Sequence, residues 1–136
     1  YGVLSKEELK SRYEVYVETY QTIIDYEAKL SADMAKIKII PTVVAYQEEL
    51  ANTISSVEAV NKTKSTGVRK LLKTITFQLE EALEKIEKLE KCIEKADAVK
   101  TKEAMFSLRE TIDVLEGLIP EDVWPLPSYA QMLFML

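Results

Sequence analysis

The fold of this chain is decided by residues 68–96, VRKLLKTITFQLEEALEKIEKLEKCIEKA. Apolar residues recur in this stretch at alternating spacings of four and three, which predicts a helix with one continuous apolar seam. The seam positions are Val68, Leu72, Ile75, Leu79, Ala82, Ile86, Leu89, Ile93 and Ala96. Leu71, Leu83 and Cys92 widen the seam to one side, so the helix should contact two or more neighbours. We therefore expect an all-α fold, an elongated antiparallel bundle of three to four long helices.

The opposite face of this helix carries acid-before-base pairs spaced four residues apart, which is typical of a face in contact with water. These pairs are Glu81 with Lys85, Glu84 with Lys88, and Glu87 with Lys91. The remaining composition agrees with one helical domain: 136 residues contain only three glycines and four prolines. A lone Cys92 cannot form an internal disulfide and fits a packed thiol beside the seam.

Charge and hydropathy exclude several classes of protein. Lys and Arg number 18 against 23 Asp and Glu, a net charge of −5, which disfavours a general nucleic-acid or anionic-membrane binder. No apolar run approaches the ~18 residues that a membrane span requires, and no leader peptide is recognisable. We expect a cytoplasmic protein without nucleic-acid or membrane partners. The chain starts at Tyr1 without methionine, and we expect that it was cut from a longer one.

The first arm should be a long helix. Ser5 and Glu8 form a predicted capping box, and helical spacing then continues from residue 6 to about residue 40. The apolar stripe of this helix, with Glu27 as its one charged member, is Leu9, Tyr13, Tyr16, Tyr20, Ile23, Leu30, Met34 and Ile37. Pro41 should kink the helix, which continues to Asn61. Either the domain is rod-like, or the helix breaks near residues 30–33.

Turns should follow at three places. Residues 61–67 are polar and end in Gly67, so they separate the first arm from the central helix in an antiparallel hairpin. The central helix should fade near Val99, with Thr101 capping a further helix. Gly117 is placed to cap the end of that helix, and Pro120 forbids its continuation.

The C-terminal region should be an extended Pro-rich strap over residues 122–127, because a residue before proline is pushed out of the helical region. A capping box at Ser128 then predicts a short terminal helix through Phe134. The apolar residues of this region should dock on the bundle. Together with three tyrosines of the first arm, they form our candidate interface: Tyr13, Tyr16, Tyr20, Trp124, Leu126 and Phe134.

Candidate chemistry is sparse. No histidine is present, which removes the usual triads, zinc sites and di-iron motifs, and no Gly-rich phosphate loop is present either. Glu27 is a stripe carboxylate that could have a raised pKa if it were buried alone, but pairing with Lys or Arg is the commoner case, and we do not assign it a catalytic role. A basic run could hold an anion at the start of the central helix, although a solvated turn explains it as well. It comprises Lys62, Lys64, Arg69, Lys70 and Lys73.

Three stretches carry a resemblance to a known family. VLSKEELKSRYEVYVETY, EAKLSADMAKIKIIPTVVAYQEELA and the terminal DVWPLPSYAQMLF resemble the C-terminal region of type III glutamine synthetases. The resemblance spans nearly the whole chain and is weakest from about residue 62 to 100. It implies a parent enzyme of nitrogen metabolism that joins ammonia to glutamate with ATP and Mg in a ring-shaped oligomer. The family's metal-binding and catalytic residues lie upstream in the parent, so no catalytic, cofactor or metal position is carried over to this chain.

Two hypotheses of different classes follow. The first is a non-catalytic helical C-terminal domain of such an enzyme, whose partners are the catalytic domain of the parent chain and neighbouring subunits of a homo-oligomer. The second is an independent helical adaptor or protein-interaction module. An enzyme in its own right is a third and more distant reading.

Overall fold

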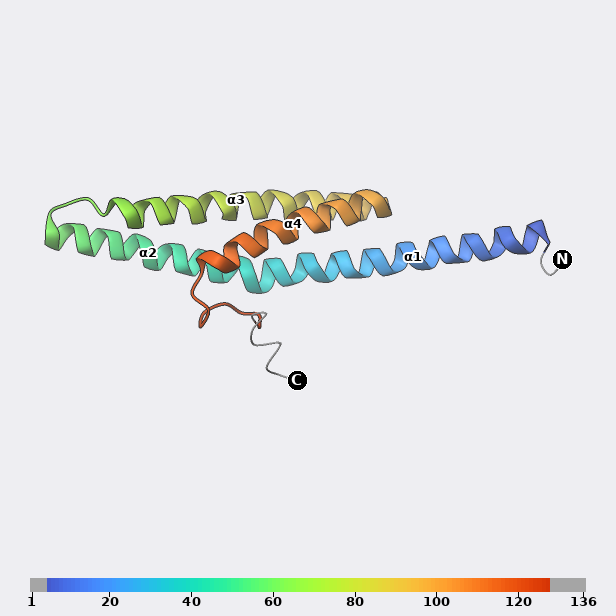
Figure 1. Cartoon of the computed structure of the whole chain (residues 1–136), viewed down its shortest axis with the longest axis horizontal. Helices are drawn as coiled ribbons and strands as arrows, with labels where there is room; N and C mark the ends of the chain where they lie inside the picture. The colour runs from blue at the N-terminus through green and yellow to red at the C-terminus, as the bar shows by residue number, and fades with distance from the viewer. Residues whose placement is uncertain (1–4, 128–136) are drawn as a thin grey trace.

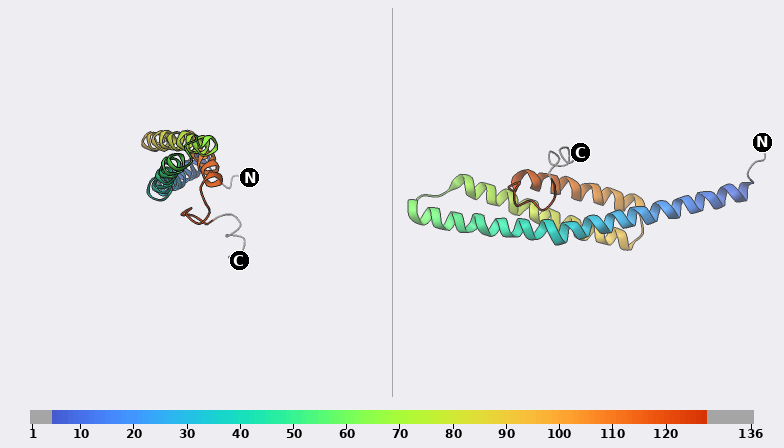
Figure 2. Two further views of the ribbon diagram at one scale, coloured as in Figure 1. Left: turned by 90° about the vertical axis from the view of Figure 1, so that its left-hand side faces the viewer. Right: turned by 90° about the horizontal axis from the view of Figure 1, so that it is seen from below.

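A computed structural model describes residues 5–127 of the chain, and its architecture is an elongated all-α bundle (Figure 1). One long helical arm runs out through α1, η1 and α2. Helix α3 then returns antiparallel to α2, and α4 turns back over α3 (Figures 1 and 2). The elements are α1 (Lys6–Met34), the π-helical turn η1 (Ala35–Ile39), α2 (Ile40–Asn61), α3 (Thr66–Glu94) and α4 (Ala98–Leu118). The predicted fold class is confirmed: the part of the chain that the structure describes contains no strand.

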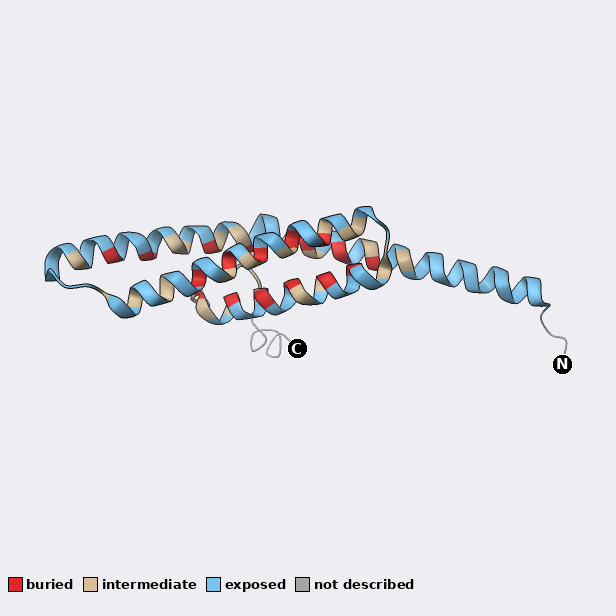
Figure 3. Ribbon diagram, turned by 90° about the horizontal axis from the view of Figure 1, so that it is seen from above, coloured by how far each residue is buried: buried red, intermediate tan, exposed pale blue. Residues whose placement is uncertain are grey.

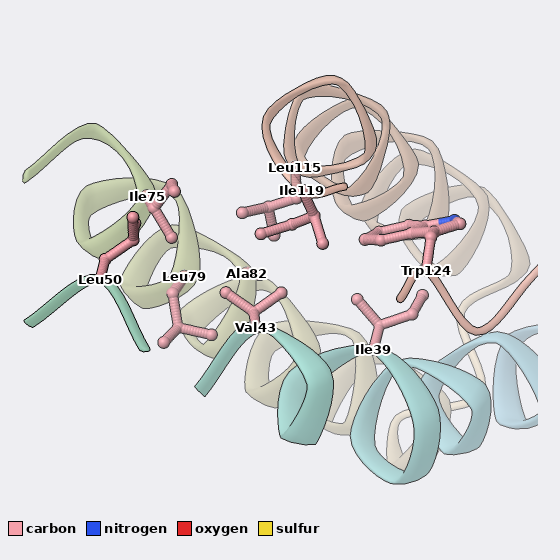
Figure 4. Close-up of a cluster of buried hydrophobic side chains, with 9 residues drawn as sticks. All are labelled: Ile39, Val43, Leu50, Ile75, Leu79, Ala82, Leu115, Ile119 and Trp124. Atoms are coloured by element: carbon pink, nitrogen blue, oxygen red, sulfur yellow. The ribbon is translucent and has the colours of Figure 1, made fainter. Parts of the chain in front are cut away.

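Helix α3 organises the bundle, as its seam predicts. It packs against α4, α2 and α1. One core cluster lies where α2, α3 and α4 meet (Figure 4). Its members are Ile39, Val43, Leu50, Ile75, Leu79, Ala82, Leu115, Ile119 and Trp124. Burial of these side chains supplies the main hydrophobic stabilisation at this end of the bundle.

A second core cluster joins α1 to α3 and α4. On α1 and η1 it consists of three alanines, whose small side chains allow close approach of the neighbouring helices. Cys92 and Ile93 pack against its edge, which agrees with the expected packed thiol. The buried members are Ala28, Ala32, Ala35, Ile86, Leu89, Ala104 and Leu108.

Polar contacts reinforce the helix pairings. The Lys85 ammonium donates to the Thr111 hydroxyl at 2.6 Å, which ties α3 to α4. An ion pair between Lys36 and Glu90 links η1 to α3. Two of the predicted acid-before-base pairs of α3 are within ion-pair distance, Glu81 with Lys85 at 3.9 Å and Glu87 with Lys91 at 3.1 Å.

The helical arm is continuous, but its one irregular turn comes before Pro41 and not at it. The prediction of one regular helix over residues 6–40 was wrong, because α1 ends at Met34 and the turn Ala35–Ile39 is π-helical. There the Ile40 amide donates to the Ala35 carbonyl five residues back. Pro41, in the first turn of α2, has no amide hydrogen, and its ring crowds the carbonyl of the preceding turn. The wider π turn accommodates this conflict, so the chain needs no break at residues 30–33.

The helix ends differ from expectation because residues other than glycine take the special backbone positions. Lys62, with φ 55°, ends α2, and Ala96, with φ 53°, lies between α3 and α4. Helix α3 ends at Glu94 rather than near Val99. Gly67 lies inside the first turn of α3, and Gly117 inside the last turn of α4, whose C-cap is Ile119.

The cap of α4 is also not the expected one. Asp97, not Thr101, caps the helix, because its carboxylate accepts from the Lys100 amide at 3.2 Å. Thr101 is instead fully buried in α4. An aspartate is as good a cap as a threonine, so the earlier of the two polar residues starts the helix.

The segment after α4 folds back onto the bundle. It is not extended throughout: the amides of Val123 and Trp124 donate to the Pro120 carbonyl, each at 3.2 Å, which closes a turn. Trp124 is only 8% exposed and joins the first core cluster, with Leu126 packed beside it. The predicted helix from Ser128 through Phe134 lies outside the described residues.

Candidate interaction surface

The first half of α1 projects beyond the rest of the bundle (Figures 1 and 2). Its start is well fixed, because the predicted capping box is present. The Glu8 amide donates to the Ser5 hydroxyl at 3.1 Å, and the Ser5 amide donates to the Glu8 carboxylate at 3.3 Å. The first residue of α1 that is buried is Ile24. Helix α1 therefore begins with about four turns that pack against no other described element.

The predicted apolar stripe of α1 faces solvent instead of the core. Tyr13 and Tyr16 are 69% and 68% exposed, and Leu9 is 54% exposed. Figure 3 shows the projecting helix as exposed throughout, while the buried residues of the arm lie farther along. Tyr20, Ile23, Leu30 and Ile37 are also exposed and Met34 is half-buried, so this stripe is not the inner face of α1.

The inner face of α1 lies about a quarter-turn away from this stripe. It comprises Ile24, Ala28 and Ala32. Glu27 stays in line with the stripe and is exposed, so the structure does not make it a buried lone carboxylate. The outer stripe, Leu9, Tyr13, Tyr16, Tyr20 and Ile23, is named the α1 seam below.

The basic run at the α2–α3 turn contains an internal anion partner. The Arg69 guanidinium donates to both carboxylate oxygens of Glu58, each at 2.5 Å, and the Ser65 amide donates to the same carboxylate at 2.8 Å. These bonds lower the pKa of the Glu58 carboxyl from 4.5 to about 2, and the hydrogen bond to Glu58, together with its charge, raises the pKa of Arg69. Glu58 is thus an internal anionic partner for Arg69 beside the start of α3.

Of the remaining residues of the run, only Lys64 acts on the Glu58 carboxylate, whose pKa its charge also lowers. Lys62 forms the left-handed end of α2. Lys73 and Arg69 border an open groove between α2 and α3, and Lys70 lies with Lys73 on a second shallow surface. The other residues that line the first groove are Ala51, Ile54, Leu72 and Thr76. Lys64 lies in the turn itself and is exposed.

The Glu58 contact predicts a defined pH dependence. A carboxyl whose pKa is lowered by folding stabilises the folded state above its unfolded pKa, and that stability is lost as the pH falls through the folded pKa. Between pH 4.5 and about 2, Glu58→Gln should therefore lose less stability than the unmodified chain. Urea denaturation at several pH values measures this. Glu84→Gln, at an exposed glutamate of α3, is the control. Parallel loss of stability in the unmodified chain and Glu58→Gln would contradict the assignment.

Metal-ligand chemistry is not assembled in this part of the chain. Within residues 5–127, no three histidine, cysteine, aspartate or glutamate side chains gather as metal ligands would. Nor does any helix of the described segment have the length and apolar character that a bilayer crossing demands. The exposed α1 seam is therefore the most distinctive surface that the structure offers.

Fold and surface together define a helical-bundle domain with a tyrosine-rich helix face that the rest of the described chain leaves uncovered. Residues 1–58, which include α1, η1 and most of α2, match the family model described as the glutamine synthetase C-terminal domain. A glutamine synthetase of Butyrivibrio fibrisolvens is 30% identical over 149 aligned residues, which cover 100% of this chain and 21% of the relative. These matches confirm that the chain resembles the C-terminal domain of glutamine synthetases.

Two further relatives extend the comparison. A glutamine synthetase of Bacteroides fragilis (strain YCH46) is 28% identical over 97% of this chain, and a type-3 glutamine synthetase of Dictyostelium discoideum is 23% identical over 98% of it. The chain spans about one fifth of the length of the relatives it matches. No solved structure matches it.

Proposed function

We propose that this chain is the non-catalytic helical C-terminal domain of a type III glutamine synthetase, and that it serves assembly of the enzyme or packing on its catalytic body. The observation that carries the proposal is the α1 seam. A helix half that packs on no other element within residues 5–127, and whose apolar residues face water, is a surface for a partner. The family match includes this half of α1.

The proposal assigns the chemistry to the rest of the parent enzyme, which would form glutamine from glutamate, ammonia and ATP with Mg in the cytoplasm. The described residues do not suit a nucleotide–metal site here. Amide formation through an acyl phosphate needs metal ligands and groups that stabilise phosphate charge. In residues 5–127 no metal-ligand cluster forms, and Arg69 is already bound to Glu58. We expect no γ-glutamyl transfer by the isolated chain.

A chimeric enzyme tests the assembly role. In the Butyrivibrio fibrisolvens glutamine synthetase, the segment that aligns with this chain is deleted, or replaced by this chain. Sedimentation velocity then reports the size of the assembly, and glutamine formation reports activity. We expect the deletion to lose the assembly of the intact enzyme and the replacement to restore it at least in part. A deletion that assembles and acts like the intact enzyme would refute the proposed role and favour an independent adaptor.

A further inference from the structure

The α1 seam has the spacing of a coiled-coil helix. Leu9, Tyr13, Tyr16, Tyr20 and Ile23 alternate at four and three residues, the same repeat that buries the seam of α3 inside the bundle. A narrow stripe of this period is buried most effectively by one other helix. Within residues 5–127, no helix covers it, since these five residues are 39% to 69% exposed.

We propose that the α1 seam pairs with the α1 seam of a second copy of this chain, in antiparallel orientation. This rests on the proposed assembly role and names its partner. Charge decides the orientation. Glu27 continues the seam by four residues, so a parallel pair would set Glu27 of one copy against Glu27 of the other inside the contact. Like charges brought together at a helix–helix contact are unfavourable.

The antiparallel alignment removes this conflict. When Tyr16 of one copy packs beside Tyr20 of the second, Glu27 lies opposite Leu9 at each end of the contact. Lys6, Lys10 and Arg12 lie within three residues of Leu9, together with Glu7 and Glu8, whose carboxylate accepts from the Ser5 amide. Three basic against two acidic residues leave a net charge of +1, so each Glu27 meets a turn with a small excess of positive charge instead of a second Glu27. The same two-fold axis produces this contact twice, as an isologous interface requires.

The available area is that of a modest interface. From their exposed fractions, the five seam side chains offer roughly 500 Å² per chain, hence about 1,000 Å² for the pair, which is at the lower edge of specific protein contacts. The contact should thus be reversible for the isolated chain. In a ring-shaped parent, many copies of the contact would act together and strengthen one another.

Sedimentation equilibrium of the full 136-residue chain tests the pairing. We expect a concentration-dependent dimer for the unmodified chain, and at least a tenfold weaker dimer for Tyr16→Glu. Val15→Glu is the matched control, because Val15 is 59% exposed and adjacent in sequence but lies outside the seam. Both positions are exposed, so circular dichroism should show unchanged helicity. A chain that stays monomeric at every concentration, or equal weakening by both substitutions, would overturn the pairing.

Cross-linking tests the orientation. In a Cys92→Ser background, Tyr13→Cys and Ile23→Cys chains are mixed and oxidised. In the proposed alignment Tyr13 of one copy lies opposite Ile23 of the second, and Glu27 is left in place. The antiparallel pair should give a disulfide between the two different chains, since the substituted positions face each other. Cross-links mainly within each variant would overturn the orientation, as would a dimer that forms none. If self-association fails, the proposed assembly role still stands or falls by the chimera experiment alone. A domain that packs only on the catalytic body would restore assembly of the chimera without pairing with a second copy.

Discussion

Replacing Trp124 by alanine should lower the free energy of unfolding by about 3–5 kcal/mol, the largest single effect that we expect. Trp124 is 8% exposed and completes the core cluster beside Ile39 and Ile119 (Figure 4). Its removal leaves a cavity between η1 and the end of α4, which nearby side chains can fill only in part. Urea denaturation followed by circular dichroism measures the change.

The control for this prediction is Val123→Ala. Val123 is the preceding residue and is 45% exposed, so its truncation should change stability by less than about 0.5 kcal/mol. Similar small losses for both substitutions would mean that the segment after α4 is not docked in solution. Water-like tryptophan emission from the unmodified chain would point to the same conclusion.

The second large effect is expected at the alanine face of α1. Ala32→Glu should destabilise the chain by about 3–5 kcal/mol, because it buries a charge without a partner. Ala32 is 2% exposed within the second core cluster. Glutamate is a good helix former, so the loss cannot come from helix propensity. Thermal and urea denaturation measure it.

Leu30→Glu provides the comparison on the same helix. Leu30 is 50% exposed, and the same charge placed there should change stability by less than about 0.5 kcal/mol. The contrast tests which face of α1 is the inner one. Strong destabilisation by Leu30→Glu with little effect of Ala32→Glu would reverse our assignment of that face.

The two long seams show what periodicity can and cannot predict. In α3 the seam consists mostly of leucine and isoleucine, and its central positions are buried as predicted. In α1 the same period runs through large apolar residues that face solvent, while the core face consists of Ile24 and two alanines. A pattern of large residues shows that a face will be covered by something. It does not show whether the cover is the same chain or another one.

Two other features depend on tertiary geometry. The bond between Glu58 and Arg69 joins residues eleven positions apart across the α2–α3 turn. The sequence shows that Glu58 comes just before the basic run, but it does not show that the two side chains bind each other. The π turn before Pro41 is one of several ways in which a helix can accommodate a proline, and the sequence predicts the conflict without predicting the solution. The α-helical class and the capping box of α1 are local properties, and both were predicted correctly.

The central claim is that the α1 seam is covered by a second copy of the chain. Hydrogen exchange of the amides of residues 6–23, measured at low and high protein concentration, tests it most directly. In a monomer these amides belong to a helix end that no other element of residues 5–127 covers, and they should exchange quickly. Our account predicts that their protection rises with concentration while that of α3 stays constant. Protection of residues 6–23 that is independent of concentration would contradict it.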